Sequence, residues 1–129
     1  PPTFPRFLPD GRSLVVTVGE NGRGDVWVLP PGGNPPRRLT ADARSWFAIP
    51  DLASRDLLVI GRGAGCSRAL RSLPLDGGEP RPVSWAQPGS AASNLTYFDV
   101  SADGRFALLV EEVHRGDVWL VEAGKGRRF

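Results

Sequence analysis

Cysteine, histidine and methionine are nearly absent from this sequence. It contains one cysteine, Cys66, one histidine, His114, and no methionine. With a single cysteine no internal disulfide can form, and the redox compartment is left open. One cysteine and one histidine are also too few for a zinc site. We therefore expect no bound metal, and no motif in the chain indicates a cofactor.

The sequence also lacks a large excess of either charge and lacks long apolar runs. The formal net charge is +2, and no run of basic residues is longer than two. A pI of about 9.4 is only the entry condition for nucleic-acid binding, so without a basic run we expect no nucleic-acid partner. No apolar run approaches the ~20 residues of a membrane helix, which predicts no membrane segment. The first residue is Pro1 rather than methionine, so we expect a trimmed or excised piece whose targeting signal is not visible.

Turn-forming residues, by contrast, are abundant, with 16 glycines and 13 prolines. Both residue types disfavour helix interiors and suit turns, so we predict an all-β fold. The apolar, β-branched stretch 14–18 is typical of a strand covered on both faces. Residues 9–11, Pro-Asp-Gly, predict a turn before this strand. Residues 20–24, which contain Asn-Gly, predict a turn after it that leads into a strand at 25–29.

Much of the N-terminal part of the chain recurs near its C-terminus. The Asp-Gly-Arg turn at 10–12 returns at 103–105, and Arg-Gly-Asp-Val-Trp at 23–27 returns at 115–119. These offsets of 93 and 92 residues correspond to two copies of a unit of about 45 residues, the length of one propeller blade. A weaker middle copy lies between them, in which residues 50–52 read Pro-Asp-Leu in place of Pro-Asp-Gly.

We therefore expect a single β-propeller segment made of three four-stranded antiparallel blades. The blades are predicted at about 4–40, about 44–83 and about 95–129, with a longer loop at 84–94. Propellers close with about 4–8 blades, so three blades would leave two apolar blade faces open to water. The chain is thus expected to be a fragment, or one half, of a closed ring of about six to eight blades. If it is not a fragment, a homodimer would complete a six-bladed ring.

Three stretches carry a resemblance to a known repeat. Residues 7–14 (FLPDGRSL), 24–28 (GDVWV) and 32–40 (GGNPPRRLT) are similar to the TolB-type, WD-like β-propeller repeat of bacteria, and residues 101–105 and 116–120 match it again. The resemblance implies a non-catalytic propeller scaffold that binds a protein or peptide partner. As an alternative it implies the accessory, substrate-gating or sensor propeller of a larger enzyme, a serine peptidase or a bacterial Ser/Thr kinase, whose catalytic domain lies outside this chain. The compartment is left open between the bacterial periplasm and the cytoplasm.

The motifs that would carry catalysis are missing or have a structural explanation. No Gly-x-Ser-x-Gly elbow is present. Residues 57–66 resemble a dinucleotide-binding loop, but Cys66 stands where glycine or alanine is required and no βαβ unit surrounds it, so we expect a hairpin loop. The two Arg-Gly-Asp triplets, at 23–25 and 115–117, fall at the same hairpin of the repeat, which favours a structural role over adhesion. We predict no catalytic residue and no enzyme activity in this chain.

The predicted binding site lies at the innermost strands. In a propeller the innermost strand of each blade lines the central channel, and side chains near its start face the opening. In this sequence those positions are Arg6, Trp46, Phe47, Tyr97 and Asp99. A mixed polar and aromatic rim is what a binding mouth requires, so we expect these residues to contact the partner.

Overall fold

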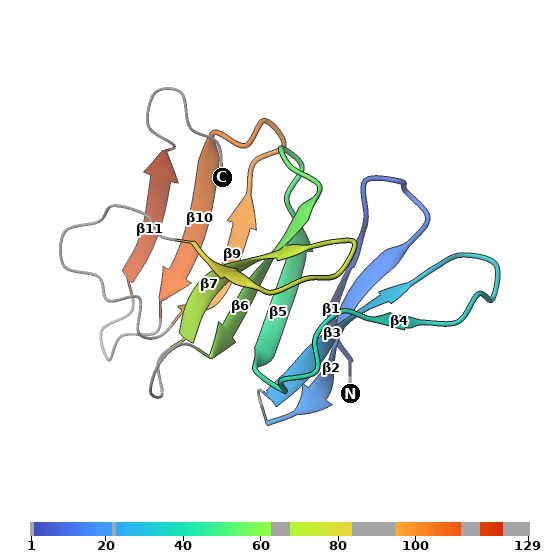
Figure 1. Ribbon diagram of the computed structural model, residues 1–129. Coiled ribbons are helices and arrows are strands. Elements are labelled where there is room, and N and C mark those ends of the chain that lie inside the picture. The colour runs from blue at the N-terminus through green and yellow to red at the C-terminus, as the bar shows by residue number, and fades with distance from the viewer. Residues whose placement is uncertain (1, 22, 63–67, 84–94, 112–116, 123–129) are drawn as a thin grey trace.

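The computed structural model is all-β (Figure 1). The residues that the structure describes are 2–21, 23–62, 68–83, 95–111 and 117–122. Within these ranges the chain forms eleven strands and no helix. None of the described segments is a helix long and apolar enough to cross a membrane.

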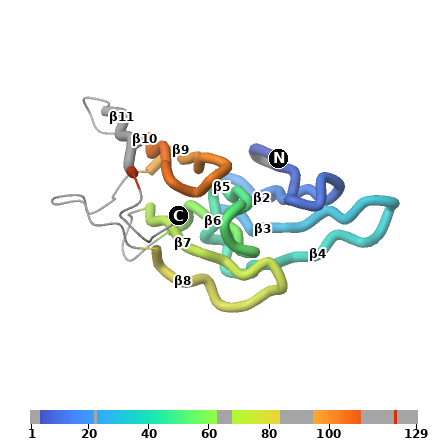
Figure 2. Tube along the Cα trace, turned by 90° about the horizontal axis from the view of Figure 1, so that it is seen from above, coloured from blue at the N-terminus to red at the C-terminus, as the bar shows by residue number. Residues whose placement is uncertain are grey.

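The strands fall into three antiparallel groups that follow one another along the chain (Figure 1). The first group is β1 (Pro2–Phe7), β2 (Leu14–Glu20), β3 (Arg23–Leu29) and β4 (Arg37–Arg38). The second group is β5 (Ser45–Pro50), β6 (Asp56–Arg62), β7 (Arg68–Pro74) and β8 (Arg81–Pro82). The third group is β9 (Leu95–Val100), β10 (Phe106–Glu111) and β11 (Asp117–Glu122). Seen from above, the short strands β4 and β8 lie at the outer rim, and β5 and β9 lie on the opposite side (Figure 2).

The loop predicted at 84–94 lies outside the described residues, as do Cys66, His114 and residues 123–129, which were expected to contain the outer strand of the last blade. The prediction that Gly-Ala-Gly at 63–65 belongs to a hairpin loop also falls outside the described residues. The strands that flank this segment, β6 and β7, pair with each other in an antiparallel register from Asp56–Pro74 to Arg62–Arg68.

The first two groups are joined where we expected separate sheets. One backbone pair, Gly24 with Ser45, connects β3 to β5, so that β1 to β8 form a continuous eight-stranded sheet. Gly24 is also crowded by β2 on its other side, because a Cβ atom there would lie only 2.9 Å from the carbonyl oxygen of Val18. The strand β3 also begins at Arg23, two residues earlier than predicted, and the positive φ of 52° falls on Asn21 in the turn before it.

The turns between the first two strands of each group follow the predicted chemistry. Asp10 accepts hydrogen bonds from the backbone N–H groups of Arg12 and Ser13, and Gly11 adopts a φ of +66°. In the middle copy Asp51 accepts a hydrogen bond from the N–H of Ala53 although no glycine follows it. The aspartate therefore closes the turn in both copies, with a following glycine in the first and without one in the middle copy.

The core consists of two apolar layers, one on each face of the second group. Along β6, Leu57 and Val59 face the first group, whereas Leu58 and Ile60 face the third group, and all four are buried. The layer toward the first group is aliphatic and contains Leu8, Val15, Val26, Val28, Ala48, Leu57, Val59 and Leu73. The layer toward the third group contains Phe47, Ile49, Leu58, Ile60, Leu70, Leu95, Phe98 and Leu109. Burying each of these large side chains stabilises the fold by about 1.5–3 kcal/mol, so the groups hold together mainly through these layers.

Candidate binding site at the inner strands

Three of the five predicted site residues meet where β1 approaches β9. The guanidinium of Arg6 donates a hydrogen bond of 2.9 Å to the hydroxyl of Tyr97, across 91 residues of sequence. The same guanidinium lies 3.9 Å from the carboxylate of Asp99, and the Tyr97 hydroxyl lies 3.4 Å from that carboxylate and donates to it. The first and third groups are thus linked by a polar cluster of Arg6, Tyr97 and Asp99, which we call the inner cluster.

The inner cluster is open to solvent on its polar side. The side chains of Arg6 and Asp99 are 41% and 49% exposed. An ion pair with this exposure contributes on the order of 0–1 kcal/mol, because water screens it and both side chains lose conformational freedom. The pair can therefore exchange its partners for those of a ligand at little cost in stability.

Phe47 packs against the Tyr97 ring of this cluster and is itself buried. Its side chain is only 1% exposed, and its ring centroid lies 5.3 Å from that of Tyr97 and 5.6 Å from that of Phe98. In this structure Phe47 is thus buried beside the Tyr97 ring, whereas the polar groups of Arg6 and Asp99 are exposed. It holds the Tyr97 ring in place by aromatic packing.

Trp46 lies next to a cation from another strand. The guanidinium of Arg68 lies 4.0 Å from the centroid of the Trp46 ring, a cation–π contact that comes from β7. The ring also packs against the core layer between the second and third groups. Trp46 is therefore placed by β7 and the core layer, whereas hydrogen bonds and an ion pair hold Arg6, Tyr97 and Asp99 together.

Sequence reasoning missed Phe4 at this site. Phe4 is mostly exposed, and its ring meets that of Phe47 edge-on at a centroid distance of 5.3 Å. Its φ of 50° is uncommon for a bulky residue, and the register of β1 against β2 shifts between Thr3 and Arg6. The bulge aims Phe4 back over the second group, and nothing in the sequence other than the neighbouring Pro5 marks it.

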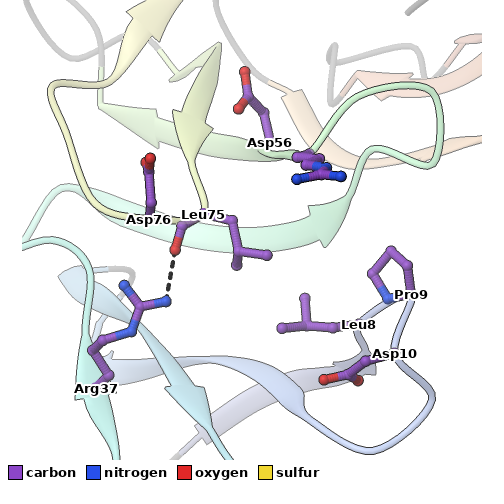
Figure 3. Close-up of a pocket in the computed structure, with 8 residues that line it drawn as sticks. Leu8, Pro9, Asp10, Arg37, Asp56, Leu75 and Asp76 are labelled. Atoms are coloured by element: carbon purple, nitrogen blue, oxygen red, sulfur yellow. Dashed lines mark hydrogen bonds between the residues drawn. The ribbon is translucent and has the colours of Figure 1, made fainter.

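Apart from the inner cluster, the structure has a crevice between the first and second groups (Figure 3). Its volume is about 490 Å³, which is within the usual range for ligand pockets. Figure 3 shows the side chains of Leu8 and Leu75 on opposite sides of the space, and Arg37 donates a hydrogen bond of 2.7 Å to the carbonyl of Leu75. The crevice is lined by Leu8, Pro9, Asp10, Arg37, Arg55, Asp56, Leu75 and Asp76.

Two carboxylates of the crevice, those of Asp10 and Asp56, accept hydrogen bonds from neighbouring residues of the protein. The hydroxyl of Ser13 and the backbone N–H groups of Arg12 and Ser13 donate to Asp10 and lower the pKa of its carboxyl. Asp56 accepts a hydrogen bond of 3.0 Å from the hydroxyl of Ser72. The crevice is therefore an apolar cleft with charged groups at its edge, of which Asp10 closes its own turn, Asp56 binds Ser72 on β7 and Arg37 binds the carbonyl of Leu75.

The described residues hold no group of three side chains suited to a metal ion. Histidine and cysteine are both missing from the described ranges, because His114 and Cys66 lie outside them. What the inner cluster offers is one cationic donor, one anionic acceptor and a hydroxyl beside exposed aromatic surface. This combination can bind a polar chain that carries both donors and acceptors, such as a peptide.

No protein-family model matches the chain. Tricorn protease homolog 1 of Streptomyces coelicolor is 32% identical over an alignment of 98 residues, and the match covers 71% of this chain and 9% of that protein. The crystal structure of TolB from Acinetobacter baumannii superposes with a TM-score of 0.72 at 20% identity, over 92% of this chain and 29% of the TolB chain. The chain thus spans less than a third of the length of either protein.

Proposed function

We propose that this chain, which has the confirmed fold of part of a TolB-type β-propeller, is a non-catalytic scaffold that binds a protein or peptide partner. The observation that supports the proposal is the inner cluster, in which Arg6, Tyr97 and Asp99 converge from two distant parts of the chain. Their polar groups are partly exposed, and they sit beside the exposed ring of Phe4.

In this proposal the partner replaces the weak internal contacts of the cluster. Arg6 turns its guanidinium to a carbonyl or carboxylate of the partner, and Asp99 accepts from an N–H group or a cationic side chain. Phe4 supplies apolar contact area, and Trp46 with Arg68 extends the surface along the start of β5. Arginine and aromatic residues carry most of the binding free energy in protein interfaces.

Selection from a displayed peptide library tests this function. We expect selected peptides to bind the purified chain in calorimetry, and Arg6→Ala and Asp99→Ala to weaken binding by about tenfold or more each, which corresponds to about 1.4 kcal/mol. The matched control is Arg105→Ala, which removes an exposed arginine whose ion pair with Glu122 lies in the third group. Binding that is indifferent to Arg6 and Asp99, or equally sensitive to Arg105, would contradict the proposed site.

A second function is favoured by one specific observation, the match to a tricorn protease homologue. In this alternative the chain is the accessory, substrate-gating or sensor propeller of a larger enzyme, a serine peptidase or a Ser/Thr kinase, and catalysis lies outside these residues. Sequencing the gene on both sides of this segment separates the two functions. A hydrolase or kinase domain in the same reading frame supports the alternative, and its absence supports the binding scaffold.

A further inference from the structure

The crevice between the first and second groups continues the aliphatic core layer outward. Leu8 is buried in that layer, and Leu75 is partly buried and packs against it. Figure 3 shows the two side chains on opposite sides of the open space, and Pro9 lies beside Leu8. An apolar group placed between the two leucines would extend a packed aliphatic surface and leave water, which favours its binding.

The carboxylates that line the crevice offer few acceptors to a ligand in this space. Both oxygens of Asp10 accept hydrogen bonds from residues of its own turn. One oxygen of Asp56 accepts from the hydroxyl of Ser72 on β7. Figure 3 shows the carboxylates of Asp56 and Asp76 pointing away from Leu8. The acceptors of the crevice are therefore either in use or turned away from the space between the leucines.

The arginines that line the crevice, by contrast, have hydrogen-bond donors to spare. Arg37 is exposed and donates from one guanidinium nitrogen to the carbonyl of Leu75. A guanidinium has several N–H groups arranged as a fork, so most of those of Arg37 remain available. Arg55 is exposed as well, and it makes no hydrogen bond or ion pair with any residue that the structure describes. The crevice thus combines apolar walls with cationic donors that no carboxylate neutralises by direct contact.

We propose that the crevice binds a small monocarboxylate with a branched apolar body. The body lies between Leu8 and Leu75, and the carboxylate accepts hydrogen bonds from Arg55 and from the remaining N–H groups of Arg37, whose planar fork matches it. A free acid and the end of a peptide with an apolar last residue present this same chemistry. The crevice shares no residue with the inner cluster, so the proposal does not rest on the proposed function.

Titration of the whole chain with isocaproate, followed by the backbone amide signals in NMR, tests the site. We expect saturable shifts at residues 8–10 and 75–76, which line the crevice. Isocaproamide keeps the apolar body but has no charge, so it should bind about tenfold more weakly, as expected for the loss of a charge-assisted hydrogen bond. Acetate, which lacks the apolar body, should also bind more weakly. N-acetylleucine distinguishes the two sources, because it should bind more tightly than isocaproate if the site takes the end of a peptide and less tightly if it takes a free acid.

Two arginine variants locate the charge that binds the acid. Arg55→Gln should raise the dissociation constant for isocaproate about tenfold. The matched control is Arg44→Gln, which removes an exposed arginine at the opposite end of β5 and should leave the constant unchanged, because salt screens exposed charges at that separation. Both positions are exposed, so circular dichroism should show both variants folded. The proposal is overturned if isocaproate gives no saturable shifts at the crevice, if isocaproamide binds as tightly, or if Arg44→Gln weakens binding as much as Arg55→Gln does.

Discussion

The contact between the first and second groups differs in chemistry from the contact between the second and third. The former has an aliphatic core layer, beside which buried polar groups tie the strands together. The latter is centred on the packed rings of Phe47, Tyr97 and Phe98, and Arg6 reaches it from the first group with a hydrogen bond to Tyr97. Copies of one repeat thus pack against their neighbours by different chemistry.

Asp25 is the centre of the polar groups that lie beside the aliphatic layer, between the first and second groups. Its carboxylate accepts hydrogen bonds from the Arg38 guanidinium at 2.6 Å, the Thr40 hydroxyl at 3.0 Å and the N–H of Ala43 at 3.0 Å. Thr40 in turn accepts from the N–H of Val26 at 3.0 Å. These bonds fix the path of the chain from the end of the first group into β5, and they are directional, so the path has little freedom.

The aromatic contact has less directional constraint. Rings separated by 5–6 Å tolerate a range of tilts, and the Phe47–Tyr97 and Phe47–Phe98 pairs already differ, at 31° and 80°. The register of β5 against β6 also shifts between Ser45 and Phe47 without loss of this packing. The comparison indicates that polar bonds set geometry at the first contact and that buried area provides stability at the second.

The largest effect should come from removing an aromatic ring. Phe98 is completely buried, so Phe98→Ala is expected to lower the free energy of unfolding by about 3–5 kcal/mol, from lost burial and the cavity left behind. Urea denaturation followed by tryptophan fluorescence measures this change. Leu52→Ala, at an exposed position, is the control and should change stability by less than about 0.5 kcal/mol. If Phe98→Ala lowers the free energy of unfolding by less than Asp25→Ala does, the polar groups and not the buried aromatic area stabilise the fold more.

Removal of the polar centre should have the next largest effect. Asp25→Ala is expected to cost about 2–3 kcal/mol, because it leaves the buried Thr40 hydroxyl and the Ala43 N–H without their acceptor. The measurement is the same urea titration, with Glu122→Gln as the control, since that carboxylate lies in an exposed ion pair. If Asp25→Ala matches the control, the polar groups do not stabilise the first contact.

The pH dependence of stability should sharpen this result. Burial raises the pKa of Asp25, but hydrogen bonds from Ala43, Arg38 and Thr40 outweigh burial and leave the pKa below its ordinary value of 3.8. The stability that Asp25 contributes is therefore present above 3.8 and is lost as the pH falls through the lower folded-state pKa. The difference in unfolding free energy between wild type and Asp25→Asn should shrink over that window. A difference that stays constant in acid would show that the charge is not involved.

The smallest effect is expected at the inner cluster. Tyr97→Phe removes the hydroxyl that Arg6 donates to but keeps the ring against Phe47. Stability should fall by about 0.5–1.5 kcal/mol at most, as is usual for a single hydrogen bond, and the Arg6–Asp99 pair remains. Thermal unfolding of Tyr97→Phe and of Tyr97→Ala, measured side by side, separates the contribution of the hydroxyl to stability from that of the ring. A larger loss for Tyr97→Phe than for Asp25→Ala would show that the inner cluster stabilises the fold more than the polar centre does.

Much of the fold could be predicted from short stretches of sequence. The apolar stretch 14–18 predicts a strand covered on both faces, and Val15 and Val16, which point to opposite faces, are both buried, whereas Val18 at its end is 43% exposed. The aspartates at the turns predict the hydrogen bonds that close them. The site was harder to predict from the sequence, because Phe4 reaches it through a bulge and Phe47 is buried beneath it. A repeat pattern identifies which strand is innermost, but not which side of that strand a bulged residue faces.

The order of the residues alone determined the all-β class, the repeat and the turn chemistry, since these depend on local backbone preferences and on periodicity within about 45 residues. Only the tertiary structure decided that Arg6 meets Tyr97 across 91 residues and that Gly24 and Ser45 join two groups into one sheet. These features depend on how the groups are placed relative to one another. That placement is set by the side chains packed between the groups, and no single segment contains them.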